Sequence, residues 1–594
     1  MRTRSLLACL VVVVAACEPG ARPSSSPPPV GLAVDAGSAP AAAPKKNAPF
    51  TVAIVIDQFS AWIADERLPK LPPDGGFARL TREGTWAHAL RYPYAITDTA
   101  PGHASLHSGV VPNQSGIFAN ERPDEKTGVR SSVFIDPETK LVGPKGLLDE
   151  YGRSIKIMKA PTVADRLRAA HPDATVISIS LKDRASLLPA GKHPTHALFY
   201  DPIFATFVTS TAIESTFPAW AVPFGDANAV KRAMQKVWEP TDRPWLEKNA
   251  GRDDAPGEGD LDGMGTVFPH KVTSPHAFRA TPNSDAVLID LALAAIDAEH
   301  KPDVPFLLLL SLTAHDIIGH TFGPSSWEAW DEVMKLDRQL ARLFAALDAK
   351  VGDWSVMLAA DHGDSAIPEA RLPFPASCKD NAPPDQWERP ICIKGGRLEP
   401  EGLRSELRAE TKRVLGNEDL ISGVSDGLVF MTKAGHALDG APRAKLDAAV
   451  KHVLLEMHAA DVAEIIDERD LKKRCPAVLA SALPAPRRAL PGEDVFTLVC
   501  RSWTDQPDTG DFVIIPRRGS YFDGEVVPLK GGSHGTPYLY DRTVPLLVRT
   551  ASKADAGRSI TAPVDFSAYA AIESSFVGLD SRTPREILDG LTAR

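Results

Sequence analysis

Residues 50–57, FTVAIVID, form the stretch that decides the predicted fold. The run is almost continuously apolar and ends in Asp57. Such runs are typical of strands buried on both faces, which occur in parallel sheets. Similar runs occupy residues 174–183 (ATVISISLKD), 304–316 (VPFLLLLSLTAHD) and 354–364 (WSVMLAADHGD). Residues 544–550 (VPLLVRT) predict a late strand of the same sheet.

Helical patterns lie between these strands. Apolar residues recur at helical spacing in residues 160–171, 284–300 and 326–350. Strands that alternate with helices predict a layered α/β fold. Residues 190–283 and 365–530 do not fit the alternation, and we expect them to be insertions that cap a site on one catalytic domain, residues 49–594.

The composition is that of an ordinary globular protein. The chain has 594 residues, of which 43% are hydrophobic and 24% are charged, and its formal net charge is -10. This charge, with no clustered Lys/Arg face, argues against nucleic acid as a partner.

The N-terminus predicts export. Arg2 and Arg4 precede an apolar run that ends at Cys17 and is shorter than the roughly 20 residues of a membrane-spanning helix. Val14-Ala15-Ala16-Cys17 resembles a bacterial lipobox, in which the Cys is lipidated, whereas the alternative is an ordinary signal peptide with an incidental Cys. Residues 18–48 are rich in Pro and Ala and predict a tether. We therefore expect an envelope protein with a lipid anchor, in the outer membrane and facing the periplasm.

Four further cysteines remain in the exported chain. An even number of cysteines in such a protein favours disulfides. Proximity in sequence favours the pairs Cys378–Cys392 and Cys475–Cys500, although spacing does not determine connectivity, and reduced buried thiols are the alternative.

Candidate metal ligands stand at the C-terminal ends of the predicted strands, where open α/β sheets bind ligands. Asp316 and His320 are spaced i and i+4, which puts both on one helix face. Taken singly, each candidate is weak, because a lone His is more often structural. Together, three carboxylates and three imidazoles suit two zinc ions better than magnesium. These six candidates are Asp57, Asp316, His320, Asp361, His362 and His534.

A candidate nucleophile lies in residues 95–110, AITDTAPGHASLHSGV. Pro101 suits the first turn of a short helix and Gly109 suits its end. A hydroxyl just before a helix lies in the field of unpaired N–H groups, which favours an anion. Thr99 has this position, whereas Thr97 lies farther out and Ser105 and Ser108 lie inside the helix.

Taken in order, the motifs resemble those of the alkaline phosphatase superfamily, and within it the bacterial phosphate-irrepressible (PafA-like) alkaline phosphatases. The resemblance covers about residues 50–550 and implies the fold of that superfamily, a three-layer α/β sandwich with a mostly parallel central sheet and capping insertions. The motifs that carry it are VIDQ, TAPGHASLHSG, GIFANE, SLKDRASLLPAG, DIIGHTFGP, ADHGD and SHGTPYLYDRTVPLL.

The resemblance also implies the role of each residue. Thr99 is the nucleophile and binds one Zn²⁺ together with Asp57, Asp361 and His362. The second Zn²⁺ is bound by Asp316, His320 and His534. Asn120, Lys182 and Arg184 hold the phosphoryl oxygens, and because the last two occupy the region of a third metal site in better-known relatives, no catalytic magnesium is expected.

Lys182 and Arg184 decide the predicted substrate class. Alternate residues of an extended segment point the same way, so both cations can meet the dianion of a phosphate monoester. From spacing alone, KDR could also be a solvated surface turn. The predicted protein is a monomeric phosphate monoesterase that acts on small phosphomonoesters through a phospho-threonine.

Two other functions are compatible with parts of this pattern. A nucleotide pyrophosphatase/phosphodiesterase of the same superfamily shares the Thr, the Asn and the zinc ligands but lacks the Lys/Arg pair. A catalytically dead zinc- or phosphate-binding lipoprotein is the alternative from another functional class.

Overall fold

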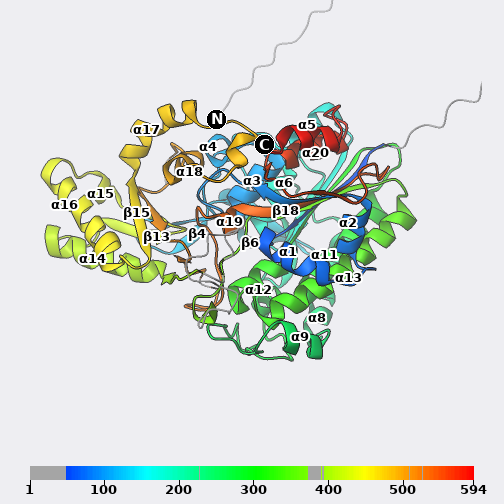
Figure 1. The fold of residues 1–594 in the computed structure, drawn as a ribbon, viewed down its shortest axis with the longest axis horizontal. Coiled ribbons are helices and arrows are strands. Elements are labelled where there is room, and N and C mark those ends of the chain that lie inside the picture. Colours follow the sequence, from blue (N-terminus) through cyan, green and yellow to red (C-terminus); the bar gives the residue numbers. More distant parts are fainter. Residues whose placement is uncertain are drawn as a thin grey trace, which may run out of the picture. The chain divides into compact units, whose positions relative to one another are not determined.

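A sheet of 12 strands forms the core of the computed structural model, which describes residues 48–225, 228–371, 390, 393–506, 509–524 and 526–593 (Figure 1). β1 (Phe50–Ile56) pairs in parallel with β10 (Phe306–Leu312) on one side and with β11 (Ser355–Ala359) on the other. β10 also pairs in parallel with β7 (Thr175–Ser180). Every residue of β1, β7 and β10 is buried, which explains why these strands lack alternation.

The predicted late strand belongs to the same sheet but runs in the opposite direction. β18 (Thr543–Arg549) lies between β11 and β2 (Thr85–Arg91) and is antiparallel to both. The sheet is completed by β19 (Arg558–Ile560) and β20 (Val564–Asp565) beside β2, and by β8 (His196–Asp201), β9 (Thr206–Ser210), β5 (Ile135–Gly143) and β6 (Gly146–Arg153) beyond β7.

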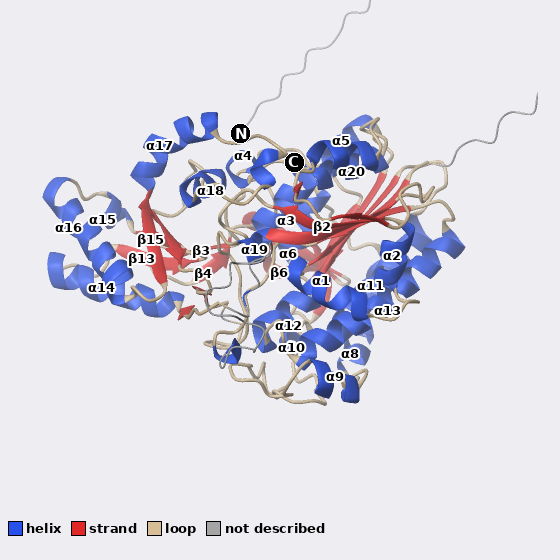
Figure 2. Cartoon of the chain, viewed as in Figure 1, coloured by secondary structure: helices blue, strands red, loops and turns tan. Residues whose placement is uncertain are grey.

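Helices cover both faces of the sheet, which confirms the three-layer α/β sandwich (Figure 2). The three predicted helices are present as α5 (Val163–Ala170), α11 (Pro282–Glu299) and α13 (Trp327–Lys350). Each begins and ends within a few residues of its expected bounds. One face carries α2 (Gly76–Glu83), α11 and α13. The other carries α3 (Thr99–Ser108), α5, α6 (Asp183–Ala190) and α20 (Ala568–Phe576).

The first stretch outside the alternation supplies β8 and β9 to the main sheet and then continues in short helices. These are η2 (Ala219–Ala221), α7 (Val222–Gly225), α8 (Asn228–Met234), α9 (Arg243–Asn249) and α10 (Pro275–Phe278). Trp238 and Phe268 of this stretch pack with Phe322 and Trp330 in one buried cluster, so the stretch has a core in common with the helix that carries Asp316.

The second stretch contains a sheet of its own, yellow to orange in Figure 1. Its strands are β13 (Ile421–Ser425), β14 (Leu428–Met431), β16 (Phe512–Pro516) and β15 (Val462–Asp467), flanked by α14 (Pro400–Leu415), α16 (Gly440–Lys451), α17 (Glu468–Ser481) and α18 (Val495–Ser502). The predicted Cys475–Cys500 disulfide is confirmed and joins α17 to α18. The other predicted pair, Cys378–Cys392, lies outside the described residues.

Short elements complete the described chain. They are α1 (Ala61–Arg67), η1 (Leu68–Lys70), α4 (Pro112–Ser115), β3 (Glu121–Pro123), β4 (Arg130–Ser132), α12 (Ala314–Phe322), η3 (Glu369–Arg371), β12 (Arg397–Leu398), α15 (Lys433–His436), η5 (His452–Met457), η6 (Arg487–Ala489), β17 (Tyr521–Phe522), α19 (Leu539–Arg542) and α21 (Pro584–Leu591).

Within the described part of the chain, no helix combines the length and the apolar character that crossing a bilayer requires. The predicted signal, the lipidated Cys17 and nearly all of the tether lie outside the described residues.

Candidate active site

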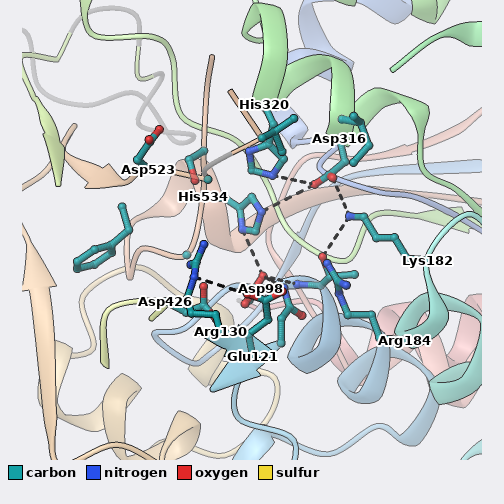
Figure 3. Close-up of a pocket in the computed structure, with 18 of the residues that line it drawn as sticks. Asp98, Glu121, Arg130, Lys182, Arg184, Asp316, His320, Asp426, Asp523 and His534 are labelled. Carbon is teal, nitrogen blue, oxygen red and sulfur yellow. Dashed lines mark hydrogen bonds and ion pairs between the residues drawn. The ribbon is translucent and has the colours of Figure 1, made fainter. Parts of the chain in front are cut away.

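The predicted site residues come together beyond the C-terminal ends of the parallel strands. Thr99, Asn120, Lys182 and Arg184 line a cavity of about 370 Å³ together with Asp316, His320 and His534. Figure 3 shows Asp316, His320 and His534 directed toward one another, with Lys182 beside them. The remaining candidates, Asp57, Asp361 and His362, are fully buried.

Asp316, His320 and His534 form one group of possible metal ligands. α12 puts the first two on one face, as predicted, with His320 Nε2 3.4 Å from Asp316 Oδ1. His534 Nε2 lies 3.8 Å from the same oxygen. The loop that carries His534 reaches this helix through glycine: a Cβ on Gly531 would stand 1.7 Å from the backbone oxygen of His320. Gly531 is therefore needed for this close backbone approach.

Asp57, Asp361 and His362 form the deeper part of the site. Asp361 Oδ2 lies 3.3 Å from His362 Nε2. His103, which the sequence analysis missed, places Nε2 3.2 Å from Asp57 Oδ1 and 3.6 Å from Asp361 Oδ2. The available signal was the helical spacing from Thr99, since His103 follows it at i+4 on the same helix. Gly102 permits this packing, because a Cβ there would lie 2.3 Å from the Asp361 carbonyl oxygen.

Thr99 is the first residue of α3 and does not lie just before the helix as predicted, whereas Pro101 lies in the first turn, as predicted. Asp98 is the N-cap, and its Oδ1 accepts a hydrogen bond from Thr99 N at 2.9 Å. Asn120 Oδ1 accepts a hydrogen bond from Ala100 N at 2.8 Å. Both side chains therefore bind N–H groups at the helix start that have no partner within the helix. Gly109 ends the helix at φ 80°, which confirms the predicted cap. Asp98 also lines the cavity and was missed, although it directly precedes the Thr.

Lys182 connects the two groups of carboxylates. Its Nζ lies 2.9 Å from Asp57 Oδ2, 2.7 Å from Asp316 Oδ2 and 3.3 Å from Thr99 Oγ1. The expectation of an extended Lys-Asp-Arg segment is wrong, because α6 begins at Asp183 and Lys182 is its N-cap. Arg184 nevertheless lines the same cavity, and its Nε is buried without a hydrogen bond.

Burial and mutual charge shift the ionisation of the site. Burial alone would raise the pKa of Asp316, but Lys182 and His320 hold that pKa well below its usual value. Burial raises the pKa of Asp361 well above its usual value, and the charge of Asp57 adds to the shift. Burial lowers the pKa of both His362 and His534, which favours the neutral imidazole that binds metals.

The donor set fits divalent metal ions. Ligand atoms lie within 4.8 Å of one another in three groups here: Asp316, His320 and His534; Asp98, His362 and His534; and Asp57, His103 and Asp361. Asp316 Oδ1, Asp361 Oδ2 and His362 Nε2 are buried yet form no hydrogen bond. Because such atoms are costly to bury without a hydrogen bond, a cation bound among them would compensate them.

The rim of the cavity contains charged residues to which the sequence analysis assigned no role. Arg130 Nε lies 3.8 Å from Glu121 Oε2, and Asp426 lines the same wall. His276 and Arg279, from α10 and its C-terminal cap, also line the cavity. Tertiary contacts alone bring these residues to the site.

Comparison with known proteins supports the resemblance. A sequence model of the type I phosphodiesterase / nucleotide pyrophosphatase family matches residues 51–537. Alkaline phosphatase PafA of Elizabethkingia meningoseptica is 32% identical over 325 residues, which cover 52% of this chain and 59% of the relative. Alkaline phosphatase PhoV of Synechococcus elongatus is 32% identical over 328 residues, which cover 53% and 59%. The chain thus spans less than two thirds of the length of these curated relatives.

A solved structure shows the same fold over nearly the whole chain. The crystal structure of wild-type alkaline phosphatase PafA matches with a TM-score of 0.75 and 25% sequence identity. The match covers 92% of this chain and 100% of that chain. The predicted α/β fold of the alkaline phosphatase type is thereby confirmed.

Proposed function

The chain belongs to the type I phosphodiesterase / nucleotide pyrophosphatase family, and we propose that within this family it is an alkaline phosphatase, a hydrolase of phosphate monoesters that uses two zinc ions and a phospho-threonine. One observation carries the proposal. Thr99 Oγ1 and Lys182 Nζ lie 3.3 Å apart in a cavity that Arg184 and Asn120 also line. Two cations beside a candidate nucleophile suit the dianion of a monoester better than the single charge of a diester.

Two zinc ions would be held by Asp57, Thr99, Asp361 and His362, and by Asp316, His320 and His534. Bound there, they supply Lewis-acid stabilisation of charge on the attacking and leaving oxygens. The ligands are carboxylates and imidazoles, the donors that zinc takes in catalytic sites.

The protein's own groups do the remaining work. Thr99 Oγ1 attacks phosphorus and releases its proton to solvent, the ester P–O bond breaks, and the leaving oxygen takes a proton from solvent. The N-terminal end of α3 and the Lys182 ammonium stabilise negative charge on Oγ1. Arg184 and Asn120 hold the non-bridging oxygens. Water then attacks the phospho-threonine, the P–Oγ1 bond breaks, and inorganic phosphate is released.

The first test compares p-nitrophenyl phosphate with its methyl diester, using zinc-loaded protein that lacks residues 1–48. We expect a large preference for the monoester, measured as the ratio of the two kcat/KM values. Lys182→Ala and Arg184→Ala are expected to lower monoester hydrolysis more than diester hydrolysis, because each removes a contact that only the dianion uses fully.

A preference of the wild type for the diester would instead assign the chain to the nucleotide pyrophosphatase/phosphodiesterase branch, which the matching family model keeps as the second candidate. Equal losses on both substrates in the two variants would mean that the pair is structural. Stoichiometric zinc without turnover would favour the dead binding protein.

We also propose that the enzyme works in the cell envelope, held by lipid on Cys17, as a monomer acting on small phosphomonoesters. The support is the sequence alone: Arg2 and Arg4, the short apolar run and the lipobox-like Val14–Cys17. Cys17→Ser should reduce the incorporation of labelled palmitate into the protein. Unchanged incorporation in this variant would contradict the lipid anchor on Cys17.

A further inference from the structure

Arg279 is a cavity residue for which the proposed reaction gives no role. It caps α10 at the C-terminal end, just before α11, and lines the same cavity as Thr99 and Arg184. Its Nε is buried without a hydrogen bond. Among the described residues, no carboxylate forms an ion pair with its guanidinium. A half-buried guanidinium that faces a cavity and has no ion-pair partner is a ready binding group for an anion.

The position of Arg279 is fixed by the core and not by a flexible loop. The preceding Phe278 is fully buried and packs edge-on against Tyr200 of β8, with ring centroids 5.7 Å apart. The Tyr200 hydroxyl donates a hydrogen bond to the Pro275 carbonyl oxygen at 3.4 Å. Thr281 Oγ1 donates one to the Phe278 carbonyl oxygen at 2.8 Å. The backbone on both sides of Arg279 is therefore anchored to the main sheet.

Its electrostatic surroundings are unfavourable for a cation. Burial lowers the pKa of Arg279 and the charge of Arg184 lowers it further, whereas Tyr200, Asp316 and Asp201 act in the opposite direction. Arg130, also at the cavity, is in a different situation, since Glu121 pairs with it at 3.8 Å. Of these two rim arginines, Arg279 is the one that forms no ion pair with an acid among the described residues.

Among the described residues, those that contact the proposed nucleophile do not include Arg279. Lys182 Nζ contacts Thr99 Oγ1 and two of the proposed ligand carboxylates, whereas Arg279 forms no hydrogen bond or ion pair with any of them. The cavity of about 370 Å³ also exceeds the space that one phosphoryl group fills. Because Asn120, Lys182 and Arg184 already hold the phosphoryl oxygens in the proposed reaction, we assign the group bound by Arg279 to the rest of the substrate.

We propose that Arg279 binds a second anionic group on the leaving-group side, so that the preferred substrates are phosphate monoesters that carry a further carboxylate or phosphate. This inference rests on the proposed monoesterase function. It makes Arg279 a specificity residue, supplied by the stretch between β9 and α11.

The test uses two matched pairs of esters that differ in the second anion. Glycerate 3-phosphate and glycerol 3-phosphate compare a carboxylate with a neutral group. Propane-1,3-diol bisphosphate and propane-1,3-diol monophosphate compare a phosphate with a hydroxyl. We expect the zinc-loaded wild type to prefer the anionic member of at least one pair, and the pair that responds identifies the anion.

Arg279→Gln is expected to lower that preference, the ratio of the two kcat/KM values, by roughly tenfold or more, as for the loss of a charge-assisted hydrogen bond. Arg279→Lys keeps the charge and should keep part of the preference. The matched control is Lys271→Gln, which removes one exposed charge from the same stretch and should leave the ratio unchanged.

A second measurement needs no variant and covers the case in which Arg279→Gln does not fold. In the wild type, 3-phosphonopropanoate should inhibit roughly tenfold more strongly than propylphosphonate, which has a methyl group in place of the carboxylate. If the second anion is a phosphate, propane-1,3-bisphosphonate takes the place of 3-phosphonopropanoate and is compared with propylphosphonate in the same way.

Three outcomes would overturn the inference. Equal ratios in the wild type and Arg279→Gln, with p-nitrophenyl phosphate still hydrolysed, would refute it and leave the proposed function standing. Equal inhibition by the anionic and neutral phosphonates would do the same. A wild type that hydrolyses no phosphate monoester would refute the proposed function, and this inference with it.

Discussion

At the scale of single residues, the structure separates Thr99 from the other hydroxyls of residues 95–110. Thr97 Oγ1 donates a hydrogen bond to the Thr536 carbonyl oxygen at 3.0 Å. Ser108 Oγ donates one to the Ala104 carbonyl oxygen at 2.5 Å, within its own helix. Thr99 is the one of these hydroxyl residues that lines the cavity, and its Oγ1 accepts a hydrogen bond from Lys182. The contacts of these hydroxyls therefore support Thr99 as the candidate nucleophile, which helix position alone favoured only slightly.

Thr99→Ala is expected to lower kcat for p-nitrophenyl phosphate by roughly 10³-fold or more, because the proposed nucleophile is removed. The fold should persist, since the change removes only one hydroxyl and one methyl group, and the lost hydroxyl forms a hydrogen bond with Lys182 alone among the described side chains. Rapid acid quenching with ³²P-labelled substrate measures the phospho-enzyme, which the variant should not form. Ser108→Ala is the matched control and should keep wild-type turnover; normal turnover in Thr99→Ala would refute the assignment.

At the scale of elements, the start of α13 carries an unusual buried acid cluster. Glu328 lies in the first turn, where a negative charge suits the helix dipole, and its Oε1 is 2.8 Å from His270 Nε2. Glu258, from the loop before α10, is 5% exposed, and neither of its carboxylate oxygens has a hydrogen-bond partner. Burial, followed by the charge of Glu328, raises the pKa of Glu258 from 4.5 to about 9. The first of the two stretches outside the alternation is thus joined to α13 by the contact between His270 and Glu328, beside an acid that keeps its proton at neutral pH.

Glu258→Gln should stabilise the protein increasingly as the pH rises. Between pH 4.5 and about 9 the folded protein keeps a proton on Glu258 that the unfolded chain has lost, so wild-type stability falls across this window. The uncharged amide removes this dependence. Thermal unfolding should give similar melting temperatures for variant and wild type near pH 5, and a growing advantage of the variant toward pH 9.

The control for this prediction is Glu247→Gln, which changes an exposed glutamate of α9 in the same stretch. It should leave the difference in melting temperature independent of pH. A difference between Glu258→Gln and wild type that stays constant from pH 5 to pH 9 would contradict the raised pKa.

At the scale of the whole molecule, the site is assembled from distant parts of the chain. Asp57 follows β1, Asp316 follows β10, Asp361 follows β11, and His534 comes from the loop before α19. The fold brings three carboxylates into one buried region, and the single ammonium of Lys182 contacts only Asp57 and Asp316 among them. Such an excess of buried negative charge destabilises the fold unless a cation compensates it.

Zinc is therefore expected to raise the melting temperature of protein first stripped with EDTA. Binding to the folded state alone stabilises it by about 4 kcal/mol when free zinc is 1,000 times Kd. Thermal unfolding with and without zinc measures the shift, and elemental analysis should find two zinc ions per chain. Asp316→Asn should reduce both the shift and the stoichiometry.

A surface site must be distinguished from the proposed one. His436, Glu468 and Asp511 also place ligand atoms within 4.8 Å of one another, outside the cavity. His436→Ala should leave the stoichiometry and the thermal shift unchanged. A loss of bound zinc in His436→Ala but not in Asp316→Asn would show that the metal binds elsewhere.

The sequence by itself determined the α/β class, the parallel strands, the Gly109 cap and the shared face of Asp316 and His320. It did so because these features depend on local patterns: continuous apolar runs, helical spacing and the φ preference of glycine. It also predicted which residues would gather, since strands that end in acidic residues meet at one edge of a parallel sheet.

Only the tertiary structure decided the rest. It placed His103 between Asp57 and Asp361 and put Lys182 at the start of a helix instead of in an extended segment. It also brought Arg279 into the cavity from a stretch without regular periodicity. These positions depend on long-range packing, such as Phe278 against Tyr200, and no local spacing in the chain encodes which distant side chains come into contact.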